Sequence, residues 1–215
     1  MTIRTTKTAV ALLALAIASP SFSATLITNG SFELGNTSGA FSTASAGSTD
    51  ITGWTVDAGS VDYISSYWAA SDGVRSIDIA GSAIGALSQS FATTAGKSYL
   101  VSFDLSSNPD LSAPRDLLVS IDGGAPSIFT HPGATGKDAA GMNWTSQSFT
   151  FLAAGPTSTI TFTTNGTAQG FFGPALDNVV AAVVPEPAAW ALMLAGFGLV
   201  GGAMRRRGSS RSVLA

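Results

Sequence analysis

Hydrophobic residues at every second position are the feature that most restricts the fold of this chain. From residue 99 to residue 105 the odd positions are Tyr99, Val101, Phe103 and Leu105. A period of two places such side chains on one face of a β-strand. The same alternation recurs in segments 75–80, 86–92, 117–121, 149–151 and 160–162, whereas residues 24–183 contain no helical period over ten or more residues. We therefore expect an all-β body.

Residues that favour tight turns separate these segments. Asp122-Gly123-Gly124 and Asn165-Gly166 follow two of them, and such pairs supply the positive φ that a hairpin needs. Many short strands with such turns predict an antiparallel jelly-roll β-sandwich. Residues 37–49 are rich in Ser, Gly, Ala and Thr, and we expect a surface loop there. No internal repeat is visible, so residues 24–183 are predicted to form one domain.

The N-terminal residues have the pattern of a secretory signal peptide. Arg4 and Lys7 precede an apolar stretch over 9–18, Pro20 breaks it, and small residues occupy Ser21 and Ser23. This order matches a basic region, a hydrophobic region and a signal-peptidase site. We expect residues 1–23 to be removed by signal peptidase after Ser23, or one residue later.

The C-terminal residues form a second targeting segment over 184–207. Its parts are Val184, Pro185, Glu186 and Pro187, then an uncharged run over 188–204, then Arg205, Arg206 and Arg207. A helix over the run would measure about 25 Å, the short end of what a bilayer core demands. The arginines favour the cytoplasmic side of a membrane. We expect a single-pass helix that places the body outside and leaves residues 208–215 as a cytoplasmic tail.

This order of parts resembles the PEP-CTERM sorting signal of Gram-negative bacteria. The resemblance implies that a membrane enzyme, exosortase, recognises and processes the tail, so that the protein reaches the cell surface or the extracellular matrix. An ordinary C-terminal membrane anchor remains the alternative.

Charge and cysteine content exclude several classes of function. Residues 25–184 hold four basic and twelve acidic side chains, a net charge of −8. A body with this negative charge repels phosphate backbones, and we therefore expect no nucleic-acid partner. The chain has no cysteine, which excludes disulfides, a thiol nucleophile and Cys-ligated metals.

A second resemblance covers nearly the whole body. In order along the chain the matching blocks are NGSFE at 29–33, ITGW at 51–54, VDYI at 61–64, SIDI at 76–79, LSQSF at 87–91, the segment 99–105, Trp144 with SFTF at 148–151, and GPALDNV at 173–179. Together they resemble the choice-of-anchor C and DUF642 proteins. That resemblance implies a galactose-binding-like β-sandwich of the kind found in carbohydrate-binding modules. The chain lacks the cysteines of the plant members and holds one sandwich instead of two.

Sugar binding requires a flat aromatic face and hydrogen-bonding side chains. One span supplies both in the side chains of Asp57, Asp62, Tyr67, Trp68 and Asp72. The segment 65–73 is predicted to be a loop, where a large aromatic is less expected in a core, although a core role for Tyr67 and Trp68 is an equal alternative.

Other aromatic side chains are assigned to the interior. We expect Trp54, Tyr63 and Trp144 in the core. Phe171 and Phe172 could line a loop rim or plug the end of the sandwich, and the plug is favoured.

Glu33 and Asp177 are a candidate calcium site. The first and last strands of such a sandwich usually lie side by side, so the two carboxylates could meet and hold a structural Ca²⁺ with help from carbonyls or amides. The alternative is that both bond to nearby backbone.

Catalytic motifs are absent from the sequence. There is one histidine, His131, expected as an exposed loop residue, and no motif of a serine hydrolase, zinc protease or nucleotide-binding protein. We therefore expect no enzyme. The favoured function is binding of extracellular polysaccharide; the alternatives are a matrix component without a defined ligand and a glycan hydrolase.

Overall fold

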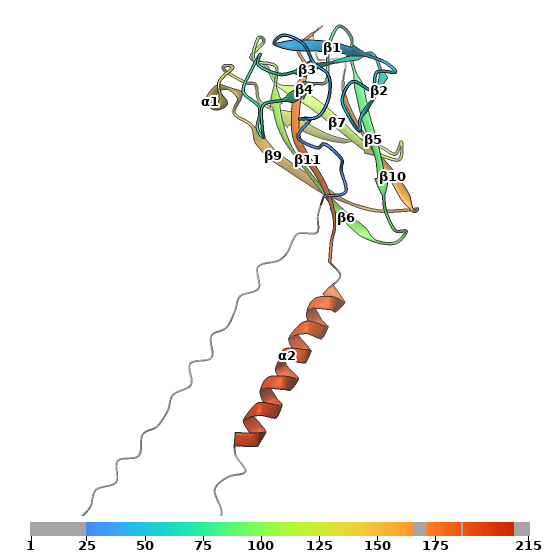
Figure 1. The fold of residues 1–215 in the computed structure, drawn as a ribbon, viewed down its shortest axis with the longest axis vertical. Helices are drawn as coiled ribbons and strands as arrows, with labels where there is room; N and C mark the ends of the chain where they lie inside the picture. The colour runs from blue at the N-terminus through green and yellow to red at the C-terminus, as the bar shows by residue number, and fades with distance from the viewer. Residues whose placement is uncertain (1–24, 166–170, 186, 209–215) are drawn as a thin grey trace, which may run out of the picture.

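Two antiparallel sheets form the body in the computed structural model, which describes residues 25–165, 171–185 and 187–208 (Figure 1). The predicted all-β jelly-roll sandwich is confirmed. In chain order the elements are β1 (Phe41–Ser45), β2 (Thr55–Ala58), β3 (Ser60–Ile64), β4 (Ser76–Asp78), β5 (Ala86–Ala92), β6 (Ser98–Ser107), β7 (Arg115–Ile121), β8 (Ser127–His131), α1 (Ala139–Met142), β9 (Thr145–Leu152), β10 (Thr157–Thr164), β11 (Pro174–Val183) and α2 (Pro187–Gly208).

Each sheet has its own strand order. The larger sheet runs β1-β3-β4-β11-β6-β9 and the smaller runs β2-β5-β10-β7-β8. The turn between β7 and β8 has positive φ at Asp122 (52°) and Gly123 (71°), as the sequence predicts for a hairpin. At the N-terminal end of the body, Leu26 N–H donates to the Ala181 carbonyl in β11, so the start of the body lies beside its last strand.

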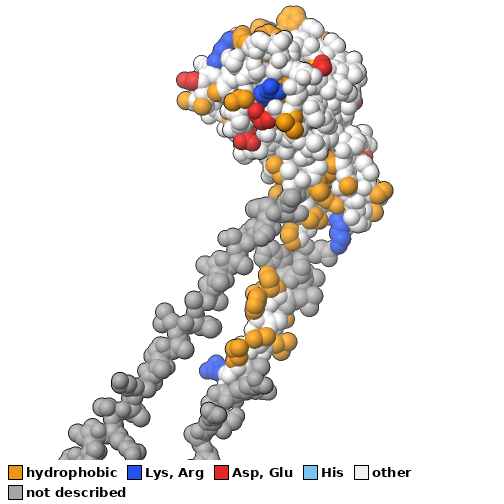
Figure 2. Space-filling model, viewed as in Figure 1, with side chains coloured by type: hydrophobic (Ala, Val, Ile, Leu, Met, Phe, Trp, Pro, Cys, Tyr) orange, Lys and Arg blue, Asp and Glu red, His pale blue; other side chains and the backbone are white. Residues whose placement is uncertain are grey.

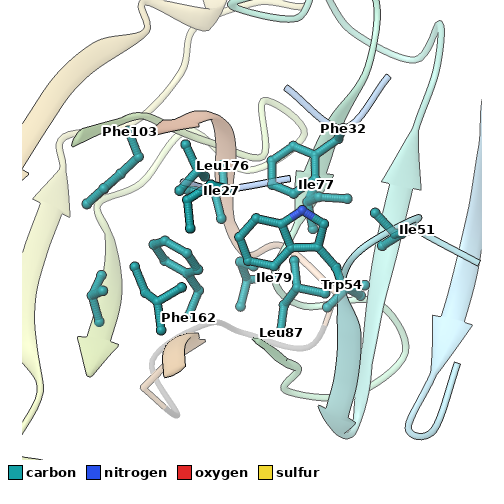
Figure 3. Packing of buried hydrophobic residues seen from close by; sticks show 14 of the residues in the cluster. Ile27, Phe32, Ile51, Trp54, Ile77, Ile79, Leu87, Phe103, Phe162 and Leu176 are labelled. Atoms are coloured by element: carbon teal, nitrogen blue, oxygen red, sulfur yellow. The ribbon is translucent and has the colours of Figure 1, made fainter. Parts of the chain in front are cut away.

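The main core fills the space between the sheets (Figure 3). Trp54 packs within it, and its ring centroid lies 5.2 Å from that of Phe32 and 6.0 Å from that of Phe162. Each fully buried large apolar side chain contributes about 1.5–3 kcal/mol relative to its exposed state. Trp54 and Tyr63 are buried, so their predicted core positions are confirmed. The Tyr63 hydroxyl donates to the Phe32 carbonyl and accepts a bond of 2.8 Å from Arg75 Nη1.

A second, smaller hydrophobic cluster covers the outer face of the larger sheet. In β3 the side chains alternate, so Val61 and Tyr63 face the main core while Asp62 and Ile64 face outward. Segments 65–75 and 132–144 fold over this face. The buried members of the cluster are Ile64, Trp68, Ala134, Met142 and Ala175, and Tyr67 and Trp144 pack against them. Trp144 is thus half-buried at the edge of this cluster.

The expectation of a loop throughout residues 37–49 is wrong, because β1 lies within it. β1 pairs with β3 in antiparallel register from Phe41↔Ile64 to Ser45↔Ser60. Of its side chains only Ala44 is buried, since β1 is the edge strand of its sheet. An edge strand with one buried side chain carries almost no hydrophobic alternation, which is why the pattern gave no signal.

The C-terminal targeting segment contains the expected helix. Val184 and Pro185 follow β11, Pro187 begins α2, and Arg205, Arg206 and Arg207 lie near its end; Figure 1 shows α2 standing away from the two sheets. Among the residues that the structure describes, no helix has the length and hydropathy of a membrane span. The predicted single-pass helix is therefore not confirmed. The predicted signal peptide and Glu186 lie outside the described residues.

Candidate functional site

A cavity of about 180 Å³ opens on the outer face of the larger sheet, beside the second hydrophobic cluster. Segments far apart in the sequence meet there: β1, β3 with the loop after it, the residues after β6, and the residues before β11. The lining residues are Phe41, Asp62, Ile64, Tyr67, Trp68, Asn108, Asp110, Phe171 and Phe172. Five of these nine side chains are aromatic, and the others are two carboxylates, one amide and one isoleucine.

Aromatic rings form part of the cavity rim. Phe41 is 42 % exposed and Phe171 is 57 % exposed, high values for phenylalanine. Phe41 packs edge-on against half-buried Tyr67, with ring centroids 5.2 Å apart at an interplanar angle of 65°. Exposed aromatic side chains at a hollow commonly mark a binding site, because a ligand that covers them removes apolar surface from water.

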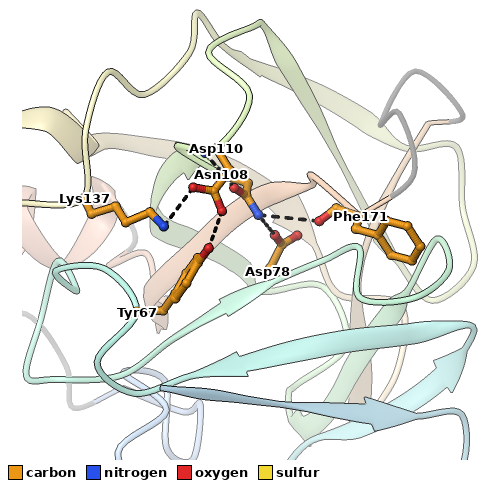
Figure 4. A network of polar contacts seen from close by, with 6 residues as sticks. All are labelled: Tyr67, Asp78, Asn108, Asp110, Lys137 and Phe171. Carbon is orange, nitrogen blue, oxygen red and sulfur yellow. Dashed lines mark hydrogen bonds and ion pairs between the residues drawn. The ribbon is translucent and has the colours of Figure 1, made fainter. Parts of the chain in front are cut away.

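Tyr67 is held by a charged pair (Figure 4). Its hydroxyl donates to Asp110 Oδ2 at 2.5 Å, Lys137 Nζ lies 2.8 Å from Asp110 Oδ1, and the same Nζ lies 3.6 Å from the Tyr67 ring centroid. Burial by itself raises the pKa of Asp110, but the bonds from Lys137 and Tyr67 outweigh it and lower that pKa overall. Lys137 therefore balances the charge of Asp110 and covers one face of the tyrosine ring.

A buried carboxylate lies behind the cavity wall. Asn108 Nδ2 donates to Asp78 Oδ2 at 2.8 Å and to the Phe171 carbonyl at 3.5 Å, as Figure 4 shows. The N–H groups of Ala80 and Gly173 donate to Asp78 Oδ1. Burial raises the pKa of Asp78 to about 8 despite these bonds. Asp78 thus fixes Asn108 and the start of β11 in place at the cavity edge.

Asp62 is a cavity carboxylate with a neutral partner. Thr43 Oγ1 donates to its Oδ1 at 2.6 Å, and burial raises the pKa of the carboxyl. Across the β3–β4 ladder Asp62 lies opposite Asp78. Among the residues that the structure describes, no lysine or arginine pairs with Asp62.

The structure brings together three of the five residues proposed to bind sugar. Tyr67, Trp68 and Asp62 line the cavity. Asp57 lies on β2 in the other sheet and is exposed. Asp72 is exposed in the loop after β3, where its N–H donates to Asp177 and its side chain is not part of the lining.

For Trp68, the structure agrees with the core role, one of the two equal alternatives from the sequence. Trp68 is only 4 % exposed, and its Nε1 donates to Ser76 Oγ at 2.9 Å. The loop that carries it folds onto the outer face of the sheet, where the indole is the largest side chain of the second cluster. Loop position in sequence did not imply exposure, because this face of the sheet is itself covered.

Sequence reasoning proposed only three of the nine lining residues for binding. Phe41 lies in a stretch expected to be a loop, and Asn108 and Asp110, like Lys137 beside the cavity, lie in irregular segments without periodicity. Phe171 was expected to plug the end of the sandwich, which its exposure contradicts. An aromatic side chain within a run of small polar residues, as at Phe41, is the signal that could have found the rim.

The candidate calcium residues Glu33 and Asp177 both accept backbone hydrogen bonds, as the alternative from the sequence expects, and the calcium site stays a prediction. Glu33 Oε1 accepts the N–H groups of Val74 and Arg75, each at 2.8 Å. Asp177 accepts the N–H groups of residues 71, 72 and 178 at 2.7–2.9 Å. The described residues contain no cluster of three or more metal-ligating acidic or histidine side chains. Both carboxylates hold the backbone of segment 71–75.

His131 is buried, so its expected exposure is wrong. It ends β8, with Nε2 2.9 Å from the Asn143 carbonyl and Nδ1 accepting the Gly133 N–H. Burial lowers the pKa of the imidazole. These contacts make His131 a support for the segment that carries Lys137.

Comparisons with known proteins separate the body from the tail. Residues 25–182 match the family described as protein of unknown function (DUF642), and residues 183–207 match the PEP-CTERM protein-sorting motif. Halomucin of Haloquadratum walsbyi is 36 % identical over 162 residues, which cover 72 % of this chain and 2 % of halomucin. The chain therefore spans a very small part of this curated relative.

Solved structures with similar folds include two carbohydrate-binding modules. TmCBM61, in complex with β-1,4-galactotriose, has a TM-score of 0.45 at 18 % identity. The match covers 74 % of this chain and 98 % of the TmCBM61 chain. The CBM35 of Paenibacillus barcinonensis has a TM-score of 0.43 at 16 % identity over 67 % and 99 % of the two chains.

Proposed function

The chain belongs to the DUF642 family and carries a PEP-CTERM sorting motif, and from this premise we propose that it is an exported surface protein that binds extracellular polysaccharide. The proposed binding site is the cavity on the outer face of the larger sheet. The observation that carries the proposal is the combination, at one hollow, of exposed aromatic rings with a carboxylate that has room for a further hydrogen bond.

Each part of the cavity matches one part of a sugar ring. The exposed rings of Phe41 and Phe171 suit the apolar C–H face of a pyranose. Asp62 accepts one bond, from Thr43, and its Oδ2 is left to accept from a sugar hydroxyl. The Lys137–Asp110–Tyr67 contacts fix the wall of the site before the ligand arrives, which lowers the ordering cost of binding.

The size of the cavity restricts the ligand. Its volume of about 180 Å³ lies below the range of about 300–1,000 Å³ typical of drug-sized ligands. It suits one sugar residue at a chain end or branch, with the rest of the polysaccharide outside.

A glycan array with the full chain tests this function. We expect retention of at least one polysaccharide or oligosaccharide, and loss of that retention in Phe171→Ala, whose side chain is exposed and not needed for the core. Ile128→Ala is the matched control, because Ile128 is equally exposed but lies on β8 in the other sheet. Retention of no glycan at millimolar concentration would contradict the proposal and leave a matrix component without a defined ligand.

Hydrolysis of glycans is tested separately. We propose binding without turnover. A glycosidase needs two carboxylates available for catalysis, and of the two in the cavity Asp110 is already bonded to Lys137 and Tyr67. Turnover of chromogenic glycosides by the wild-type chain, lost in Asp62→Asn, would overturn this assignment.

A further inference from the structure

The charges around the cavity do not balance. Two carboxylates line it, Asp62 and Asp110, and Lys137 is bonded to the second. Asp62 has only the hydroxyl of Thr43, and its neighbour across the ladder is another acid, Asp78. Asp78 in turn feels the field of buried Arg115, which bonds to the carbonyls of Pro114 and Phe172. Of the two carboxylates that line the cavity, Asp62 is therefore the one without a cationic partner among the described residues.

The aromatic lining favours the same sign of ligand charge. The faces of Phe and Tyr rings carry partial negative charge and attract cations. Tyr67 already has an ammonium group over its ring, that of Lys137, at 3.6 Å from the centroid. Phe41 and Phe171 offer further ring surface at the rim. A ligand group that is both cationic and attached to a sugar ring would satisfy Asp62 and the rings together.

We propose, building on the polysaccharide-binding function above, that the cavity selects an amino sugar with a free ammonium group. The ammonium donates to Asp62, while the sugar ring packs on the phenylalanines of the rim. Acidic sugars are disfavoured, because the body has a net charge of −8 and Asp62 would repel a uronate. Neutral sugars can enter but leave Asp62 without a cation.

Three tetrasaccharides that differ only at C2 test the proposal. The β-1,4-linked tetramers of glucosamine, N-acetylglucosamine and glucose carry an ammonium, an acetamide and a hydroxyl on the same backbone. Calorimetric titration of the full chain should give the glucosamine tetramer at least about tenfold higher affinity than the other two, as expected for a hydrogen bond to a charged group. The preference should shrink in high salt, because Asp62 is partly exposed.

Asp62→Asn removes the charge and keeps the shape. We expect it to lower the affinity for the glucosamine tetramer to that of the other two tetramers. Asp57→Asn is the matched control, since Asp57 is an exposed carboxylate on β2 of the other sheet, and it should leave the preference intact. Thermal unfolding of both variants checks that they fold, and the comparison of the three ligands on the wild-type chain needs no variant.

The outcomes separate this inference from the function on which it rests. Equal or tighter binding of the acetylated or neutral tetramer by the wild-type chain would overturn the amino-sugar selection and leave polysaccharide binding standing. A preference for glucosamine that survives in Asp62→Asn would overturn the role of Asp62. Failure to bind these tetramers and every glycan of the array would overturn both.

Discussion

Four aspartates on the outer face of the larger sheet are buried or half-buried: Asp62, Asp78, Asp104 and Asp177. The side-chain and backbone donors bonded to them are hydroxyls and amides, such as Ser71 for Asp104. Neutral donors compensate a buried charge only partly. Burial raises the pKa of three of them, Asp62, Asp78 and Asp177, and these three therefore couple the stability of the body to pH.

Asp78 should make the protein more stable in acid than in base. Its pKa rises from 3.8 in the unfolded chain to about 8 in the folded one, so the folded state binds more protons between these values. Stability is then fully present below about pH 4 and falls as pH rises to about 8, by at most about 1.4 kcal/mol per pH unit. Urea unfolding from pH 4 to 8 measures this slope.

The variant Asp78→Asn mimics the protonated acid and should flatten the slope, while Asp177, with its pKa raised to about 7, keeps its own part. Equal slopes in the variant and the wild type would show that Asp78 ionises without cost.

Glu33 should stabilise the loop that carries Tyr67. Its Oε1 accepts two backbone N–H groups of segment 71–75, and bonds to a charged acceptor are among the stronger ones. We expect Glu33→Ala to lower the free energy of unfolding by about 1–3 kcal/mol, and Glu33→Gln, which keeps an acceptor, by less. Chemical denaturation measures both. A rise in melting temperature with added Ca²⁺ that Glu33→Gln abolishes would contradict this role and support a calcium site.

At the level of elements, the step from one sheet to the other depends on a single glycine. β2 belongs to the smaller sheet and β3 to the larger, and only Gly59 lies between them. Its φ is +56°, and a Cβ there would lie 1.9 Å from the Ile84 carbonyl oxygen. The crossing therefore requires both the left-handed backbone and the missing side chain.

Gly59→Ala should cost more than about 2 kcal/mol of stability, since the strain of a left-handed alanine adds to a backbone clash. Gly96→Ala is the control: its φ is +79° but nothing lies within 4 Å of the added Cβ, so only the conformational cost of about 1–2 kcal/mol applies. Guanidinium unfolding of the two variants gives the difference. Similar losses in both would mean that segment 84–85 can move aside.

The strands were predictable from the sequence where they are buried on one face. β5, β6, β7 and β10 show the period of two because their alternate residues fill the main core. β1 was not predictable, because its burial is confined to Ala44. A period of two is visible in a strand with one buried face, but not in an edge strand such as β1 that buries a single side chain.

The cavity was predictable only in part for a related reason. The candidate residues were taken from one continuous span, which includes the cavity-lining Tyr67 and Asp62 but also Asp57, which lies in the other sheet. Phe41 and Phe171 reach the same place from opposite ends of the body sequence. Their meeting depends on the register of β1 with β3 and on the start of β11 beside β4, which composition alone does not encode.

At the level of the whole molecule, charge is unevenly distributed between body and tail. The body has a net charge of −8, whereas three consecutive arginines lie near the end of α2. Figure 2 shows few charged side chains on the visible face of the body, most of which is uncharged. An acidic body repels the phosphate backbone of nucleic acid, whereas an uncharged, hydroxyl-rich polymer meets no such repulsion.

The PEP-CTERM motif should be removed from the mature protein in a host that has exosortase. We expect the intact mass of the surface form to lack the residues from Trp190 to Arg207. Replacing Pro185, Glu186 and Pro187 together by alanine should preserve the tail, because the proline pair and its acid define the start of the motif. A mature mass that still contains the tail in the wild type would contradict processing.

The direction of β11 also decides how the protein reaches its surroundings. The strand starts at Pro174, next to the cavity residues Phe171 and Phe172, and ends at Val183, where the sorting segment begins. Its ten residues put roughly 30 Å between the two points. The cavity therefore lies near the end of β11 opposite the end that leads into the sorting segment. β11 thus separates the proposed binding cavity from the sorting segment by the length of the strand.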